Sequence, residues 1–184
     1  GFDRADSKGK VCFLSLGDQR TTVQNELSAA YPDQSLVESE AMFRDELATV
    51  VEFIEEPTKP LHLALELNGT VFQKQVWTAL AQTQPGEAIT YRELAIRIGS
   101  PGSSRAVGAA CGQNRIALAI PCHRAVRSDG KVSGFRWGMH RKLELLRRER
   151  RALGGTTTSQ LHFAAFANSP AHPSSLTKTT RKLP

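Results

Sequence analysis

Two helix starts in the middle of the chain constrain its fold more than any other feature of the sequence. Thr70 with Gln73, and Thr90 with Glu93, have the form of a capping box. In this motif a threonine and a Gln or Glu three residues later satisfy free backbone N–H groups at a helix start. The first pair predicts a helix that runs to about residue 82. The second predicts a short helix, for which Gly99 is a suitable stop. The second half of the chain is therefore expected to be mostly helical.

Two further helices are expected in this second half. The turn-forming stretch "SPGSS" leads into a helix that starts at Ser103 or Ser104 and runs to about residue 113. Together with the helix over residues 90–98, it suggests a helix-turn-helix. The final helix covers residues 139–150, and its apolar spacing predicts that Leu143 and Leu146 face inward.

The first part of the chain has a mixed pattern. We expect strands at "VCFLSLGD", residues 11–18, and at "LHLALEL", residues 61–67, with helices over 20–30 and 40–56. Few residues precede the first of these strands, so a neighbouring first strand is expected to be missing. The fold class is therefore α+β, with a small α/β subdomain over residues 1–68 and a mostly helical domain over residues 69–151. Residues 152–184 are rich in Ser, Thr, Pro and Ala, contain no acidic residue, and are expected to form a disordered tail.

The charge is distributed unevenly along the chain. Residues 1–70 carry 6 basic and 13 acidic side chains, whereas residues 71–151 carry 15 basic and 5 acidic ones. A basic half favours a polyanionic partner, and nucleic acid is the first candidate. The alternative is a generally basic surface. No window approaches eighteen consecutive apolar residues, so no membrane-spanning helix is expected. Three cysteines, Cys12, Cys111 and Cys122, form neither a disulfide framework nor a Cys-x-x-Cys zinc motif, and a reducing compartment is expected.

The second helix of the expected helix-turn-helix has an unusual composition. In "SSRAVGAACG" only Arg105 and Val107 carry bulk. A helix that reads the major groove is expected to offer several polar side chains to base edges. Small side chains instead allow a close backbone approach to a narrow minor groove, with Arg105 as the one long probe able to enter the base stack. The alternative is that these small residues mark tight packing of the helix inside the protein.

A cysteine and a histidine are adjacent in "AIPCHRAV", residues 119–126. A nearby imidazole can activate a thiol as a nucleophile, directly or through a bridging water, and a carboxylate is then needed to orient the imidazole. Glu144, Glu149 and Asp129 are the downstream acids available for that role. The alternative is a buried structural cysteine beside a histidine whose hydrogen bonds are satisfied.

At this point the sequence resembles a known family. "IPCHRAV" is similar to the I-P-C-H-R-V-V signature of the O6-alkylguanine-DNA alkyltransferases. "GTVFQKQVWTAL", "GEAITYRELAIRIGSPGSSRAVGAACGQN" and "SGFRWGMHRKLELLRRE" also resemble that family, in the same order and with compatible spacing. The resemblance covers about residues 7–151 and is greatest to the carboxy-terminal domain of bacterial Ada-type proteins. It implies a ribonuclease-H-like α/β subdomain ahead of the helical domain.

The resemblance implies a role for particular residues. Cys122 accepts the alkyl group, His123 relays the proton through a water, Glu149 completes the relay, and Asn114 braces the active-site turn. Tyr91 helps to rotate the nucleotide out and contacts it, and Arg105 fills the gap left in the base stack. The remaining residues expected to contact DNA or the alkylated base are Ser104, Ala106, Gly108, Ala125, Phe135 and Arg136. Ala125 and Phe135 depart from the family pattern of valine and tyrosine, and we expect them to alter rate or alkyl-size tolerance.

The implied function is DNA repair. The chain would act as a methylated-DNA–protein-cysteine S-methyltransferase that binds double-stranded DNA at the minor groove and flips out an O6-alkylguanine. The alkyl group, from that base or from O4-methylthymine, would pass irreversibly to Cys122 and consume the protein. No cofactor or metal is expected, and the protein is expected to be a cytoplasmic monomer that joins the nucleoid when bound to DNA. The alternatives are a non-catalytic protein that binds alkyl lesions and a DNA-binding regulator.

Overall fold

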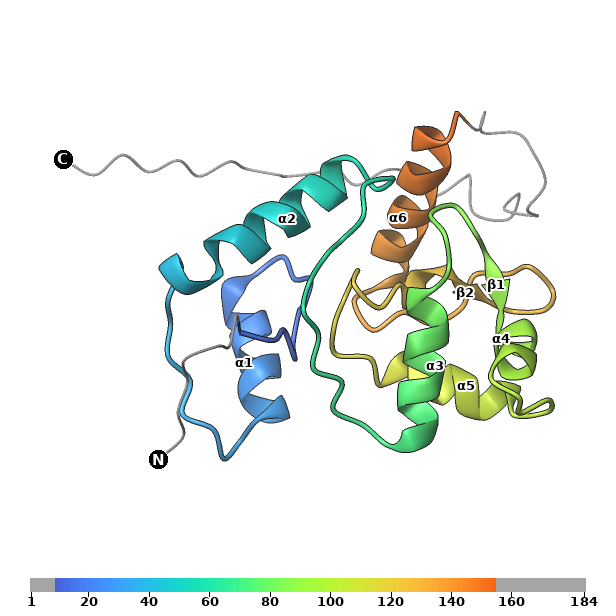
Figure 1. Cartoon of the computed structure of the whole chain (residues 1–184), viewed down its shortest axis with the longest axis horizontal. Helices are drawn as coiled ribbons and strands as arrows, with labels where there is room; N and C mark the ends of the chain where they lie inside the picture. The colour runs from blue at the N-terminus through green and yellow to red at the C-terminus, as the bar shows by residue number, and fades with distance from the viewer. Residues whose placement is uncertain (1–8, 155–184) are drawn as a thin grey trace.

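The computed structural model describes residues 9–154 of the chain and is mostly helical, with one small two-stranded parallel sheet (Figure 1). The amino-terminal helices form one side of the molecule, the helices from the middle of the chain form the other, and the last helix lies beside both at one end (Figure 1). The elements are, in order, α1 (Arg20–Ala30), η1 (Ala41–Phe43), α2 (Arg44–Glu55), α3 (Val71–Ala81), β1 (Ile89–Thr90), α4 (Tyr91–Arg97), α5 (Ser104–Gly112), η2 (Cys122–Arg124), β2 (Ala125–Val126) and α6 (Met139–Ala152). The expected disordered tail lies outside the described residues from residue 155 onward.

Both capping boxes predicted from the sequence are confirmed. The Thr70 side chain accepts from the Gln73 backbone N–H and the Gln73 side chain accepts from that of Thr70, and Thr90 pairs with Glu93 in the same way. Gly99 has a φ of +70°, a left-handed conformation that suits glycine, and ends the second helix as predicted. The start of α5 differs in detail from the expectation. Ser103 occupies the cap position, but its hydroxyl donates to the Ser100 carbonyl rather than capping the helix.

The strands expected near the amino terminus are present only as isolated pairings. Within residues 9–68, Val11 pairs with Leu65, and three residues later Leu14 pairs with Ile116. The segment therefore passes from one neighbour to another before a ladder of several residues can form. Regular strands need that continuous pairing, so residues 11–18 and 61–67 stay irregular. The pairing of Leu14 has a useful consequence, because it ties this segment to the loop that precedes η2.

The two amino-terminal helices form where the apolar spacing predicted them, but α2 buries only part of its apolar residues. Val50 and Phe53 are buried, whereas the other apolar positions of α2 and η1 include several that are well exposed: Met42, Phe43, Leu47 and Val51. The apolar residues of this segment extend around more than one face of the helix. Periodicity locates such a helix but does not decide which face packs.

The core lies between α3, α4 and α5, which pack against one another. Val76, Leu80, Leu94 and Val107 have no exposed surface, and the Trp77 indole N–H donates to the Ala110 carbonyl at 2.9 Å. The helix-turn-helix expected from the sequence is present as α4, a turn and α5. No helix in residues 9–154 is long and apolar enough to cross a membrane.

The parallel pairing of β1 with β2 positions the start of α4. Ile89 pairs with Ala125 and Thr90 with Val126. Because Tyr91 directly follows β1 and η2 directly precedes β2, this short sheet holds the first residue of α4 close to the Cys-His-Arg turn.

The final helix buries a different stripe from the one expected. Leu146 is buried as predicted, but Leu143 is only half-buried, and the inward positions are Lys142, Leu145, Leu146 and Glu149. These positions follow the i, i+3, i+4, i+7 spacing of a single helix face. Two of the four are charged, which is why apolar periodicity alone selected a neighbouring face.

Candidate active site

The segment before Cys122 is a tight turn held by one buried amide. Asn114 has no exposed surface. Its Nδ2 donates to the Ile120 carbonyl at 2.9 Å, and its Oδ1 accepts from the Ile116 N–H at 2.8 Å. Leu118, inside this turn, has a φ of +65°, which a leucine adopts only under constraint from its surroundings. The same Asn114 Nδ2 lies 3.2 Å from Cys122 Sγ, so the side chain that fixes the turn also contacts the thiol.

Cys122 lies in a one-turn 3₁₀ helix. The residue is 4% exposed. Burial raises the pKa of the Cys122 thiol, while the hydrogen bond from Asn114 and the charge of Lys142 act in the opposite direction. The resting group is therefore a protonated thiol, placed beside two groups that stabilise a thiolate once its proton is removed.

His123 is buried completely and contacts the final helix. Its Nε2 lies 2.8 Å from Glu149 Oε1. Burial lowers the pKa of His123, and Glu149 opposes that shift. In the neutral imidazole Nε2 then donates to Glu149 and Nδ1 is left as the acceptor. Among the described residues, His123 Nδ1 is a buried side-chain polar atom without a hydrogen-bond partner.

The structure distinguishes between the three acids considered for the histidine. Glu149 contacts it, whereas Glu144 is half-exposed and pairs with Arg147 and Arg148. Asp129 is also exposed and pairs with an arginine of its own loop. Only Glu149 is therefore in position to orient the imidazole.

Glu149 accepts more hydrogen bonds than the sequence analysis anticipated. Arg124 donates to Oε1 from Nη2 at 2.8 Å and from Nε at 3.1 Å, and the Gly86 N–H donates to Oε2 at 2.8 Å. Burial raises the pKa of the Glu149 carboxyl, but the hydrogen bonds from His123 and Arg124 outweigh it and bring the pKa to about 2. The carboxylate is therefore ionised over the whole physiological range.

Lys142 is a residue of the site that sequence reasoning missed. It has no exposed surface, and its Nζ donates to the carbonyls of Ala125 at 2.6 Å and Ser133 at 2.8 Å. Burial lowers the pKa of Lys142 to about 8, while the Cys122 thiol favours the charged form. The signal that points to it is its position, seven residues before Glu149 on the same helix face.

The Ala125 carbonyl, expected to serve the guanine amino group, thus already accepts from Lys142. A carbonyl oxygen has a second lone pair, so this contact leaves room for another donor.

Tyr91 and Phe135 lie around the same site. The Tyr91 hydroxyl is 3.2 Å from Ser133 Oγ, and a side chain added at Gly108 would meet the Tyr91 ring at 4.0 Å. The Phe135 ring packs edge-on against the His123 ring, with centroids 6.4 Å apart. Tyr91 thus connects α4 with the loop that follows β2, and the structure brings these predicted residues together.

The other predicted DNA contacts lie at the surface. On α5, Val107, Ala110 and Cys111 are buried, while Arg105 and Ala106 are exposed. Ser104 and Gly108 are half-exposed, and Arg136 is exposed on the loop before α6. The packing alternative therefore holds for part of the small-residue helix, and the DNA contact stays a prediction. One face packs inside the protein, and the other presents small side chains and one arginine to solvent.

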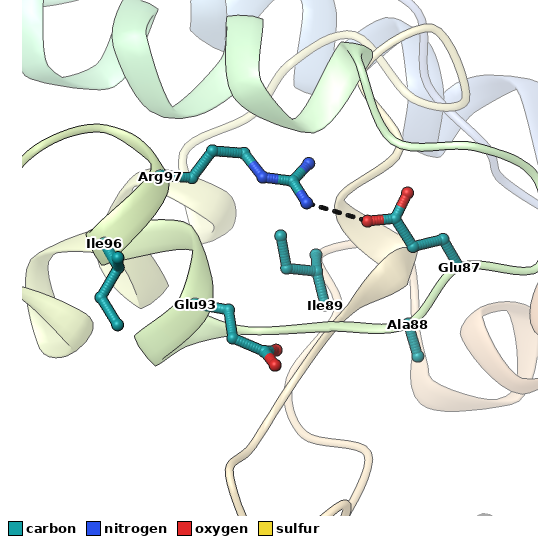
Figure 2. Close-up of a pocket in the computed structure, with 6 residues that line it drawn as sticks. All are labelled: Glu87, Ala88, Ile89, Glu93, Ile96 and Arg97. Carbon is teal, nitrogen blue, oxygen red and sulfur yellow. Dashed lines mark hydrogen bonds and ion pairs between the residues drawn. The ribbon is translucent and has the colours of Figure 1, made fainter.

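Two pockets in the described part of the chain are lined by none of the predicted site residues. One, of about 350 Å³, is lined by Glu87, Ala88, Ile89, Glu93, Ile96 and Arg97. Figure 2 shows the Arg97–Glu87 ion pair spanning this hollow, at 3.0 Å. The second pocket lies between α3 and α4. Residues 9–154 contain no cluster of three or more His, Cys, Asp or Glu arranged to hold a metal ion.

Comparison with known proteins relates this site to one family. A family model described as the DNA binding domain of 6-O-methylguanine DNA methyltransferase matches residues 71–151. Among curated proteins, the Escherichia coli bifunctional transcriptional activator/DNA repair enzyme Ada is 43% identical over 145 residues, which is 79% of this chain and 41% of that protein. The chain therefore spans about two fifths of the length of the Ada proteins it matches.

Shorter relatives are covered more fully. A methylated-DNA–protein-cysteine methyltransferase of Methanosarcina acetivorans is 42% identical over 118 residues, which is 64% of this chain and 75% of the relative. Among solved structures, Mycobacterium tuberculosis OGT in complex with DNA is similar with a TM-score of 0.58 and 38% identity, over 60% of this chain and 68% of that one.

Proposed function

This chain belongs to the O6-methylguanine DNA methyltransferase family, and we propose that it repairs O6-alkylguanine in double-stranded DNA by moving the alkyl group to Cys122. The observation that carries the proposal is the arrangement of one buried thiol between an amide donor and a histidine–carboxylate pair. It supplies a nucleophile, a donor for its thiolate and an oriented base, brought together from the end of α5, η2 and α6. O4-methylthymine is the second substrate we propose.

The reaction follows from these contacts. The thiol proton passes to His123 Nδ1 through a bridging water, and Glu149 stabilises the imidazolium that forms. The thiolate attacks the alkyl carbon in line, so that the carbon–sulfur bond forms as the carbon–O6 bond breaks. The leaving guanine takes up a proton at N1 from water, and the imidazolium of His123 returns the thiol proton to water, so that the protons balance. The product thioether is a poor leaving group, and each protein molecule therefore acts once.

The DNA must present the alkyl carbon to a thiol that is almost fully buried. A paired guanine cannot reach it, and we propose that the nucleotide is flipped out of the duplex. Arg105 projects from the exposed small-residue face of α5 and fills the gap, while Tyr91 contacts the flipped nucleotide. Ser104, Ala106, Gly108 and Arg136 contact the DNA, and Ala125 and Phe135 border the base.

The remaining assignments are part of the same proposal. Residues 1–68 correspond to the α/β, ribonuclease-H-like subdomain, and residues 69–151 to the alkyltransferase domain. The protein acts as a monomer in the cytoplasm, on the nucleoid when bound to DNA. The basic second half of the chain supports an electrostatic attraction to DNA that weakens with salt.

A titration of repaired lesions tests the proposal. A duplex oligonucleotide with one O6-methylguanine is mixed with increasing amounts of the full chain, and the remaining lesion is quantified after digestion. We expect one lesion repaired per protein molecule with no further turnover, and no repair by Cys122→Ser. Lesion-selective binding without repair would favour the lesion-binding alternative, and a strong preference for one undamaged sequence would favour the regulator. Either result would overturn the proposal.

A further inference from the structure

Arg124 is a buried cation that no step of the proposed reaction uses. It is 4% exposed, and its guanidinium group reaches from the catalytic turn to two other segments. Its Nε and Nη2 form a fork on Glu149, and its Nη1 donates to the carbonyl and the hydroxyl of Thr83, just beyond the end of α3. Arginine offers such a planar set of donors, and a lysine cannot reproduce it.

We propose that Arg124 is a positioning residue that keeps the Glu149 carboxylate ionised and directed at His123 Nε2, so that His123 stays neutral at rest with Nδ1 free to accept the thiol proton. This inference rests on the proposed function for its kinetic consequence. The protonation state of His123 can be measured without that function.

Without the arginine, the buried His123–Glu149 pair would carry an uncompensated negative charge. An isolated carboxylate in such surroundings is costly, and it gains most by sharing a proton with the nearest base. The imidazole would then be protonated before any substrate arrives, with a proton already on Nδ1. A protonated Nδ1 cannot take the proton of Cys122. With Arg124 present, the charge of Glu149 is already compensated, and the pair gains little by binding a proton.

The other charged groups around the pair are consistent with this assignment. Lys142 on α6 also acts against protonation of His123, and Glu87, from the turn before β1, faces Arg124. The neighbouring thiols and phenol are neutral below pH 8, because burial raises the pKa of each: Cys122, Cys111 and Tyr91. Arg124 is the cation that touches the Glu149 carboxylate directly.

The test compares pH profiles of alkyl transfer in single-turnover experiments with saturating methylated duplex, from pH 5 to pH 8. Wild type keeps its rate well below the ordinary pKa of histidine. For Arg124→Gln we expect the acid limb to move upward by about one pH unit, which is a loss of up to about tenfold at the acid end of the range that is recovered at pH 8. Arg124→Lys keeps the charge without the paired donors, and its acid limb is expected to lie between those of wild type and Arg124→Gln.

A double variant separates this role from simple structural support. If Arg124 acts through the charge of Glu149, removing that charge as well abolishes the shift. In Arg124→Gln/Glu149→Gln the acid limb therefore returns to the wild-type position, although the maximal rate is lower. Arg148→Gln is the matched control, since Arg148 Nη1 also ties α6 to another element through the Ile54 carbonyl. It is expected to lower the melting temperature without moving the profile.

Nitrogen-15 NMR of the histidine ring gives a readout that does not need transfer. At the midpoint of the variant's acid limb we expect a mostly neutral His123 with its proton on Nε2 in wild type, and a substantial fraction of doubly protonated ring in Arg124→Gln. An unshifted profile together with a neutral ring in a folded Arg124→Gln would overturn the inference and leave the proposed function intact. Failure of wild type to transfer would overturn the function, and the NMR result would still decide the role of Arg124.

Discussion

Replacing Asn114 with alanine tests whether one side chain both builds the turn and activates the thiol. The Asn114 amide makes three contacts: with the Ile116 N–H, the Ile120 carbonyl and Cys122 Sγ. Alanine leaves the buried Ile116 N–H unpaired, whereas the Ile120 carbonyl loses one of its two donors and keeps the Cys122 N–H. An unpaired buried group costs about 1–3 kcal/mol and a lost hydrogen bond about 1 kcal/mol, so we expect a loss of about 3 kcal/mol in the free energy of unfolding. A domain of this size has about 5–15 kcal/mol available and remains folded at 25 °C.

The third contact concerns the rate. A hydrogen bond to a charged group contributes about 1.5–3 kcal/mol, and the Asn114 amide donates to the sulfur as it becomes a thiolate. Its loss is expected to slow alkyl transfer by about 10- to 100-fold. Denaturant unfolding of the unalkylated protein measures the first effect, and quench-flow transfer from a methylated duplex measures the second.

Asn25→Ala is the matched control, because Asn25 lies on the exposed side of α1 and makes no contact with the site. It is expected to change neither quantity measurably. A folded Asn114→Ala protein that transfers at the wild-type rate would refute the reasoning, since the sulfur would then need no donor from this residue. Full stability in the variant would equally contradict the bracing role.

Three further predictions follow from individual contacts. Lys142→Met removes the cation that binds the Ala125 and Ser133 carbonyls, and we expect alkyl transfer to be at least tenfold slower. We also expect a higher pKa for the Cys122 thiol, measured by the pH dependence of its alkylation by iodoacetamide. An unchanged pKa of Cys122 would contradict this. The pKa of the Glu149 carboxylate is lowered to about 2, so its stabilisation is complete above pH 4.5 and is lost as pH falls to 2. Over that window the free energy of unfolding of wild type should fall by about 3 kcal/mol more than that of Glu149→Gln, and an equal fall would contradict this. Arg105→Ala should slow transfer from duplex DNA more than tenfold but leave transfer from the free base O6-benzylguanine unchanged, because a free base needs no flipping. Equal slowing with both substrates would contradict the proposed role of Arg105.

Local signals predicted the helical half of the fold well. The capping boxes at Thr70 and Thr90 and the stop at Gly99 need only residues a few positions apart, and all three are confirmed. The strands expected near residues 11–18 and 61–67 depend on distant partners. Leu14 finds its partner in Ile116, about a hundred residues away, and no local pattern indicates how many consecutive residues such a pairing includes.

In the site, too, some contacts could be predicted from the sequence and others could not. The resemblance indicated that Glu149 rather than Glu144 serves His123, and the structure brings those two side chains together. Arg124 and Lys142 were missed because charged residues are rarely buried, and apolar periodicity does not count them. The contacts that account for their burial are non-local, as with Arg124 and Thr83, which are 41 residues apart. Such contacts become visible only in the folded chain.

The central claim is that one thiol, that of Cys122, takes the alkyl group. The most direct test is the intact mass of the protein after reaction with a duplex that contains one O6-methylguanine, followed by peptide mapping. The account predicts a gain of about 14 Da, one methylene, located on Cys122 and absent in Cys122→Ala. Cys12 and Cys111 serve as internal controls and should stay unmodified. A methyl group on either of them, or an unchanged mass while the lesion disappears from the DNA, would contradict the claim.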